Sequence, residues 1–268
     1  MKKRNRLIRK LEEQKKKAQK VFCAFLTLGY PSLAATSKLI ESFEREGVDL
    51  IELGFPFSDP LADGPTIQFS SEWALRLGVK MQDAFQQVRD LRKKGVEIPI
   101  VFFSYLNPIH HYGIKRFVLD AKKAGFDGLI VPDCPPEEEK LLQKICCQEG
   151  LSQVFLVAPT TLKPRMKMIV RHSEGFIYYV SLRGVTGARK SLPIDIKRPL
   201  DFMRRQTNKP VLIGFGVSTP KQGRRLAKLS QGVIVGSAII DHLRNSRGRL
   251  SPTVRFVRTL VNAVKKHG

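Results

Sequence analysis

The chain has 268 residues, 42% of them hydrophobic, which suffices for one large domain with a substantial core or for two small ones. Lys and Arg number 47 against 24 Asp and Glu, and the resulting net charge of +23 would attract polyanions. No apolar run reaches about 18 residues, so no membrane span is expected. Residues 1–20 are basic and lack the apolar segment of a secretory signal, and we therefore expect a cytoplasmic protein.

Neither the cysteines nor the basic residues form a recognisable binding motif. Cys23, Cys134, Cys146 and Cys147 include no C-x-x-C pair and no Cys/His cluster with zinc spacing, so they are interpreted as reduced thiols and no metal site is expected. The basic residues are spread through predicted helices, and few aromatic residues lie among them. We therefore expect no nucleic-acid partner, and interpret the charge as a solvated surface or a docking face for an acidic partner.

Short apolar runs alternate with longer amphipathic stretches along the chain, which begins with a predicted helix over about 6–18. Several short runs are continuously apolar, a pattern typical of parallel strands buried on both faces. Several amphipathic stretches end at a glycine, the usual residue beyond a helix C-terminus. The predicted strands are 21–27, 49–53, 98–103, 128–131, 153–157, 176–180, 211–214 and 232–235, and the later helices are 33–46, 84–94, 114–124, 137–149, 163–171, 200–205, 220–228 and 253–266.

Eight strand–helix units in about 250 residues predict an α/β fold, a (β/α)8 TIM barrel with an extra N-terminal helix. We expect residues 1–20 to form a basic helix that caps the bottom of the barrel. Because no linker or break in composition interrupts the chain, residues 1–268 are predicted to form a single domain. A doubly wound open sheet is the structural alternative.

Two acidic residues stand at the end of the second predicted strand, where a barrel places its functional groups. Glu52 lies within the strand, and Asp63 lies in the Pro- and Gly-rich loop that follows. A carboxylate among apolar strand neighbours is costly unless it has a role or a partner, and acids on rigid elements suit general acid/base chemistry. From position alone, Glu52 could instead be a structural acid paired with Lys or Arg, and Asp63 a turn former.

Three glycine-bearing loops follow the last three predicted strands, at 184–188, 214–218 and 235–238. Glycine lets the backbone approach an anion closely. Ser237 would begin a short helix, whose N-terminal dipole favours an anion. Barrels often bind phosphate at the loops after strands seven and eight. Glycines also make plain turns, but three such loops on one rim favour a phosphate site.

Other polar residues near this rim have weaker signals. Tyr105 directly follows the third predicted strand. Asp133, within Val-Pro-Asp-Cys-Pro-Pro, is interpreted as the centre of an Asx-type turn. Tyr178 is expected to pack in the sixth-strand region with its hydroxyl near the rim. His110 and His111 have no partner motif and are interpreted as surface residues of a loop.

Four motifs, in this order along nearly the whole chain, resemble the α subunit of tryptophan synthase. The most specific is residues 52–65, Glu-Leu-Gly-Phe-Pro-Phe-Ser-Asp-Pro-Leu-Ala-Asp-Gly-Pro. The others are 131–133 (Val-Pro-Asp) with a proline at 135, 184–188 (Gly-Val-Thr-Gly-Ala) and 214–216 (Gly-Phe-Gly). The resemblance implies a carbon–carbon lyase of tryptophan biosynthesis, which cleaves indole-3-glycerol phosphate by a retro-aldol reaction to indole and glyceraldehyde 3-phosphate.

The resemblance also implies roles for the site residues. Glu52 would be the general acid/base, which protonates the indole carbon and removes the glycerol hydroxyl proton, and Asp63 would accept the indole N–H. Thr186 would hold Asp63 when the loop after the sixth strand closes, and Tyr178 would support Glu52. Phosphate would bind at Gly187, Gly216, Gly236 and Ser237, and indole would be walled by Phe25, Phe103 and Phe215.

A partner is implied as well. In the family, indole passes to a β subunit that carries pyridoxal phosphate, so this chain is expected to need no cofactor of its own. The loops 56–63 and 107–112 would dock that subunit in an α2β2 assembly. The chain departs from the usual family pattern at Tyr30, Cys134, Leu182, Arg183 and Gln231, none of which is a proposed catalytic residue.

Three rival functions remain open beside the lyase with a β partner. One is a standalone lyase that releases indole, and sequence does not separate it from the first. Another is a slow regulatory subunit that mainly activates the β subunit, and the last is a nucleic-acid binder on a borrowed barrel. The intact pair of Glu52 and Asp63 argues against these last two.

Overall fold

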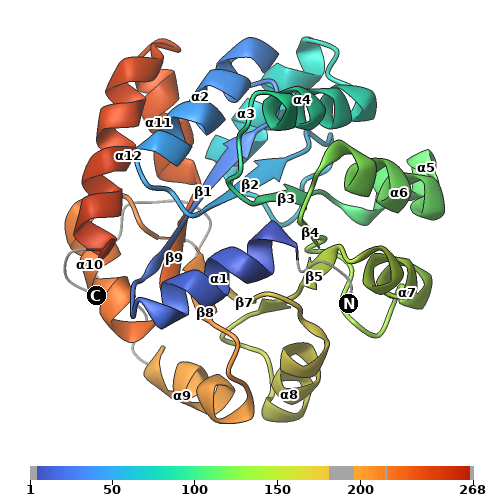
Figure 1. Ribbon diagram of the computed structural model, residues 1–268, viewed down its shortest axis with the longest axis vertical. Coiled ribbons are helices and arrows are strands. Elements are labelled where there is room, and N and C mark those ends of the chain that lie inside the picture. Colours follow the sequence, from blue (N-terminus) through green and yellow to red (C-terminus); the bar gives the residue numbers. More distant parts are fainter. Residues whose placement is uncertain (1–4, 181–195, 215, 266–268) are drawn as a thin grey trace.

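A computed structural model describes residues 5–180, 196–214 and 216–265 of the protein. Its parallel strands form one sheet in the order β5-β4-β3-β2-β1-β9-β8-β7-β6 and lie at the centre of a ring of helices (Figure 1). This is the predicted α/β barrel, and the open-sheet alternative is wrong. The strands are β1 Val21–Thr27, β2 Leu50–Gly54, β3 Ile100–Phe103, β4 Gly128–Ile130, β5 Ser152–Val154, β6 Leu156–Val157, β7 Ile177–Val180, β8 Val211–Gly214 and β9 Gly232–Val235.

The described strands number nine rather than the predicted eight because the fifth barrel strand is divided. Its first part, β5, pairs with β4, and its second part, β6, pairs with β7. Phe155 lies between the two parts, and its carbonyl accepts a hydrogen bond of 3.2 Å from the Tyr178 N–H. The single predicted strand 153–157 therefore changes partner at Phe155, and this change brings the two ends of the sheet together.

Each predicted helix has a counterpart among the described residues, with ends that differ by a few residues. The helices are α1 Arg6–Lys16, α2 Leu33–Arg45, α3 Pro65–Arg76, α4 Met81–Lys93, α5 Leu106–Tyr112, α6 Ile114–Ala124, α7 Lys140–Glu149, α8 Lys163–His172, α9 Lys197–Gln206, α10 Pro220–Leu229, α11 Ser237–Asn245 and α12 Leu250–Lys265. The predicted helix 114–124 matches α6, and the short helix expected at Ser237 is α11. None of the helices in the described ranges has the length and apolar character needed to cross a bilayer.

Helices α3 and α5 were not predicted, and the physical reason differs between them. Two of the four buried residues of α3 are serines, so its sequence lacks a clear apolar period, although Pro65 occupies the first turn where proline is favoured. Helix α5 has seven residues, of which only Ile109 is buried. The interpretation of residues 107–112 as a loop was therefore wrong: they belong to α5.

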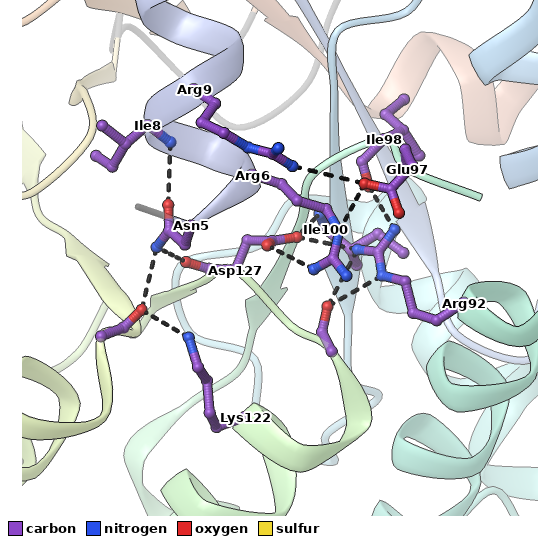
Figure 2. A network of polar contacts seen from close by, with 12 residues as sticks. Asn5, Arg6, Ile8, Arg9, Arg92, Glu97, Ile98, Ile100, Lys122 and Asp127 are labelled. Carbon is purple, nitrogen blue, oxygen red and sulfur yellow. Dashed lines mark hydrogen bonds and ion pairs between the residues drawn. The ribbon is translucent and has the colours of Figure 1, made fainter. Parts of the chain in front are cut away.

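The N-terminal helix α1 lies across the amino-terminal ends of the strands, opposite the rim that carries the site (Figure 1). Its Leu7 is fully buried, and a Cβ atom on Gly175 would lie 3.0 Å from the Leu7 Cδ2. Figure 2 shows the polar network beneath the barrel, centred on Asp127. One carboxylate oxygen of Asp127 accepts from Arg6 Nη1 at 3.1 Å and the other from Arg92 Nη2 at 2.9 Å. This network joins α1 to the loops before β3 and β4.

Candidate active site

Glu52 lies within β2 and Asp63 in the loop that follows the carboxyl end of this strand, as the sequence predicted. Glu52 is the middle residue of β2 and is only 1% exposed. It is in register with Phe25 of β1, so the two side chains lie on the same face of the sheet. Asp63 is partly buried near the end of loop 55–64, just before α3, and its N–H donates to the Pro60 carbonyl at 2.9 Å. The turn conformation of Asp63 is thus what places its carboxylate at the rim.

The surroundings of Glu52 favour its neutral form. Burial raises the pKa of Glu52 to about 8, and the neighbouring Cys23 thiol opposes this with a hydrogen bond that favours the charged form. The Oε1 atom has no hydrogen-bond partner among the described residues, and none of their ion pairs includes Glu52. Within the described part of the chain, Glu52 is therefore not the partner of a structural Lys or Arg. A carboxyl group with a pKa near neutrality is suited to proton transfer in both directions.

Asp63 has a different environment. Burial raises its pKa to about 6, and a hydrogen bond from the Tyr105 hydroxyl to Oδ2, at 3.1 Å, limits the rise. At pH 7, Asp63 is mostly ionised whereas Glu52 is mostly protonated. Two acids whose environments separate their pKa values in this way can divide the roles of proton carrier and charge stabiliser.

Aromatic side chains form the wall of the site beside Glu52. Phe25 meets Phe103 edge to face, with ring centroids 5.6 Å apart. Tyr178 on β7 is buried, and the charge of Glu52 is a cause, second to burial, of the raised pKa of its hydroxyl. Gly54 and Gly214 leave room for these rings, because a Cβ atom on Gly54 would overlap the Phe25 ring and one on Gly214 would overlap Tyr178. Tyr178 thus lies in the sixth barrel strand, β7, and is close enough to Glu52 to be affected by its charge.

The predicted phosphate side of the site is described in part. Gly236 is the N-cap of α11 and Ser237 its first residue, so the first N–H groups of this helix face the end of β9 without intrahelical partners. Gly216 after β8 has a φ of +83°, which favours glycine. Asp241 of α11 accepts a 3.0 Å hydrogen bond from the Thr66 hydroxyl, which ties this helix to α3. Thr186, Gly187 and Phe215 lie outside the described residues.

Several weaker expectations can now be compared with their positions. Asp133 does follow β4 in a turn, but its carboxylate accepts the Leu106 N–H, at 3.0 Å and 3.2 Å to its two oxygens, and so caps the start of α5. His110 and His111 are exposed as expected, although in a helix, and His110 Nε2 lies 3.3 Å from Glu139. Tyr105 contacts Asp63 directly and was not among the predicted site residues. Its place directly after β3 was the available signal.

A buried acid within a barrel strand and a second acid in the loop after it, both with raised pKa values, form an arrangement typical of enzymes that work by proton transfer. Comparison with known proteins makes this specific: a profile of the Tryptophan synthase alpha chain family matches residues 11–267. The chain belongs to the tryptophan synthase alpha chain family, and the lyase assignment made from the sequence is confirmed.

Relatives and solved structures agree over nearly the full length. The chain is 41% identical to the tryptophan synthase alpha chain of Thermoanaerobacter sp. (strain X514), over 98% of this chain and 99% of the relative. It is 43% identical to that of Geobacter sp. (strain M21), over 94% and 95%. The solved tryptophan synthase subunit alpha of Legionella pneumophila str. Paris superposes with a TM-score of 0.88 at 34% identity, covering 97% and 98% of the two chains. Mycobacterium tuberculosis tryptophan synthase in space group F222 gives a TM-score of 0.89 at 32% identity, covering 98% and 99%.

Proposed function

We propose that Glu52 and Asp63 carry out the cleavage of indole-3-glycerol phosphate to indole and glyceraldehyde 3-phosphate. The observation that supports this is the difference between the pKa values of the two acids, which are raised to about 8 for Glu52 and to about 6 for Asp63. At neutral pH, Glu52 therefore favours the protonated form and Asp63 the ionised form. The reaction needs one group that gives and takes a proton and one that stabilises positive charge. These two side chains meet that need without a metal or a cofactor.

In the proposed steps, Glu52 gives one proton to the substrate and takes one back. Protonated Glu52 gives its proton to the indole carbon that bears the glycerol chain, and the ring nitrogen becomes positive. Ionised Asp63 accepts the hydrogen bond of that N–H and stabilises the charge. Glu52, now a carboxylate, removes the proton of the adjacent glycerol hydroxyl as the carbon–carbon bond breaks. Glu52 thereby returns to its starting form, and both products leave neutral at the reacting atoms.

The remaining predicted residues bind the substrate in this proposal. Phe25 and Phe103 flank the indole ring, and Tyr178 supports Glu52 from β7. The N–H groups at the start of α11, with Gly236, Ser237 and Gly216, hold the phosphate, since a helix N-terminus favours an anion. Thr186, Gly187 and Phe215 complete the proposed site.

The catalytic roles are tested by Glu52→Gln and Asp63→Asn, with Asp59→Asn as a control. Asp59 is an exposed acid of the same loop, where its Oδ2 accepts from the Ser58 hydroxyl at 3.0 Å. Cleavage is measured as glyceraldehyde 3-phosphate release, and folding by thermal unfolding. Both site variants should lose at least about 1,000-fold in kcat/KM, as expected when an essential proton-transfer or charge-stabilising group is removed. Retention of activity by either folded variant would refute its role.

We further propose that the carboxyl-end rim docks a β subunit that holds pyridoxal phosphate, in an α2β2 assembly in the cytoplasm. Three of the exposed large apolar side chains follow strands at this rim. Leu61 after β2 is 94% exposed, Leu162 after β6 is 76% exposed, and Leu141 after β4 is 53% exposed. Leu61 lies in loop 56–63 itself, so burial against a partner would remove its apolar side chain from water. The docking surface would comprise loop 56–63 and helix α5.

A standalone lyase is distinguished from this assembly by measuring cleavage with and without a β subunit. Stimulation by the β subunit, lost in Leu61→Asp while the unstimulated rate is kept, would support docking at this rim. Equal rates with and without the β subunit, and no complex in light scattering, would favour the standalone enzyme. The stoichiometry follows from the molar mass of the complex.

A further inference from the structure

Loop 55–64 is held at its catalytic end by one phenol from the neighbouring strand. The Tyr105 hydroxyl accepts a hydrogen bond of 2.9 Å from the Ala62 N–H and donates one of 3.1 Å to the Asp63 Oδ2. Its ring also packs against Phe57, with centroids 5.4 Å apart. Tyr105 therefore contacts loop 55–64 at Phe57, Ala62 and Asp63. Asp63 is a proposed catalytic residue, and Ala62 is its neighbour in the chain.

Tyr105 is itself rigidly placed. It is only 3% exposed and is the N-cap residue of α5. The next residue, Leu106, donates its N–H to the Asp133 carboxylate, and the preceding Ser104 donates its N–H to the Ile130 carbonyl at 3.1 Å. The segments after β2, β3 and β4 are thus joined in one chain of contacts that runs from Asp133 through Tyr105 to Asp63.

We propose that Tyr105 is a positioning residue, which orients the Asp63 carboxylate for the indole N–H. This inference rests on the proposed function of Asp63. Because the phenol holds Oδ2, rotation of the carboxylate is restricted, and Oδ1, which accepts no hydrogen bond among the described contacts, is left for the substrate. The same hydrogen bond favours the charged form of Asp63, which is the form that stabilises a positive indole nitrogen. Tyr105 thereby acts on both the direction and the charge of Asp63.

Tyr105→Phe tests the proposal, with Tyr112→Phe as a matched control. Tyr112 also donates to an aspartate, Asp120, at 2.6 Å, but this pair lies on α5 and α6 and has no hydrogen bond to loop 55–64 among the described contacts. For Tyr105→Phe we expect kcat/KM at pH 7 to fall about ten-fold. The acidic limb of the pH profile of kcat/KM should also move to higher pH by about half a unit to one unit, because Asp63 loses a hydrogen bond that favours its charged form. In assays without a β subunit, where the proposed docking surface of α5 plays no part, Tyr112→Phe should match the wild type.

A second substitution works in the opposite direction and keeps the ring and the hydroxyl. Incorporation of 3,5-difluorotyrosine at position 105 makes the phenol a stronger donor, so the acidic limb should move to lower pH. A purely structural role for Tyr105 would not shift the limb in opposite directions in the two proteins. This substitution also keeps the test available if Tyr105→Phe folds poorly.

The outcomes separate this inference from the proposed function. A wild-type chain that does not cleave indole-3-glycerol phosphate, or an Asp63→Asn variant that still does, would refute the proposed function itself. An active wild type and an inactive Asp63→Asn, combined with a Tyr105→Phe profile that superimposes on the wild type, would overturn only the positioning role. An equal shift in Tyr112→Phe would also overturn it.

Discussion

At the scale of single residues, the buried position that raises the pKa of Glu52 also lowers the stability of the fold when Glu52 is charged. The pKa of its carboxyl group is raised from the ordinary value of 4.5 to about 8 in the folded chain. A raised pKa means that the folded state binds the proton more tightly than the unfolded state does. The stabilisation by the neutral group is therefore complete below about pH 4.5 and is lost as the pH rises through about 8. At alkaline pH the buried charge costs up to about 5 kcal/mol, at 1.36 kcal/mol for each unit of pKa.

This cost predicts a stabilised variant. Glu52→Gln has a similar shape and no charge, so its melting temperature should nearly equal that of the wild type at pH 5 and exceed it at pH 9. Thermal unfolding across this range is the measurement. Asp59→Asn, at an exposed position, serves as the control and should show no such divergence. A gap that narrows as the pH rises would contradict the assignment of a raised pKa to Glu52.

A second residue-scale feature is the space left by Gly54. A Cβ atom there would overlap the Phe25 ring, and Phe25 is already packed against Phe103. We expect Gly54→Ala to destabilise the fold by about 1–3 kcal/mol, the usual cost of overpacking a core, and to reduce kcat/KM because Phe25 must move. Phe25→Leu in the same chain should recover part of the stability in denaturant unfolding. Additive losses in the double variant would show that the two residues do not compete for this space.

At the scale of elements, the position of the site residues could be predicted from the sequence, but two of the elements around them could not. The acids and glycines follow strands whose apolar runs mark them, so their common rim was visible from strand order. Helix α5 was missed because only Ile109 among its seven residues is buried and because its first N–H, that of Leu106, is capped by Asp133, 27 residues away. The division of the fifth strand was missed for a similar reason, since the change of partner at Phe155 depends on β4 and β7 and has no mark in the local sequence.

The contacts of α1 and of the loop before β4 depend on one buried acid. Asp127 is 1% exposed and accepts from Arg6, from Arg92 and from the Ile100 N–H at 3.0 Å. Asp127→Ala should cost about 3–5 kcal/mol, because it leaves buried cationic and amide donors without their acceptor. Arg9→Ala, which removes an exposed pair with Glu97 at 3.6 Å, should cost less than about 1 kcal/mol. Urea unfolding distinguishes the two, and equal losses would contradict the central role of Asp127.

At the scale of the whole molecule, the positive charge is unevenly distributed. Residues 196–265 contain 15 Lys and Arg but two Asp and Glu, whereas residues 5–180 contain 25 and 21. Composition alone showed the excess of charge but not its place. In the structure the basic segment forms one side of the helical ring, with α9, α10 and α12 in succession (Figure 1). Such a field attracts anions to the molecule, including a phosphorylated substrate.

The field predicts a salt-dependent KM. When the salt concentration is raised to about 0.5 M, the Debye length falls to a few ångströms, and the positive field no longer attracts the substrate from a distance. KM should therefore rise several-fold while kcat stays constant. Reversing the four exposed cations of α10, with Lys221→Glu, Arg224→Glu, Arg225→Glu and Lys228→Glu, should make the dependence shallower. The same number of reversals, at Lys93 and Lys94 at the end of α4 and at Lys115 and Lys123 of α6, provides the control. Identical salt slopes in the wild type and the α10 variant would refute steering by this side.

The helix that closes the bottom of the barrel also has a consequence for synthesis on the ribosome. Asn5, at its start, donates to the carbonyls of Asp127 and Gly150 and to the Ser152 hydroxyl. Lys15, near its end, donates to the Asn208 carbonyl. The first helix to be translated therefore has its binding partners in segments that are translated much later. Until the fifth strand has been translated, the first helix therefore cannot dock on the barrel, and Leu7 and Leu11 remain exposed to solvent. The order of translation thus makes the first helix one of the last elements to be fixed in place.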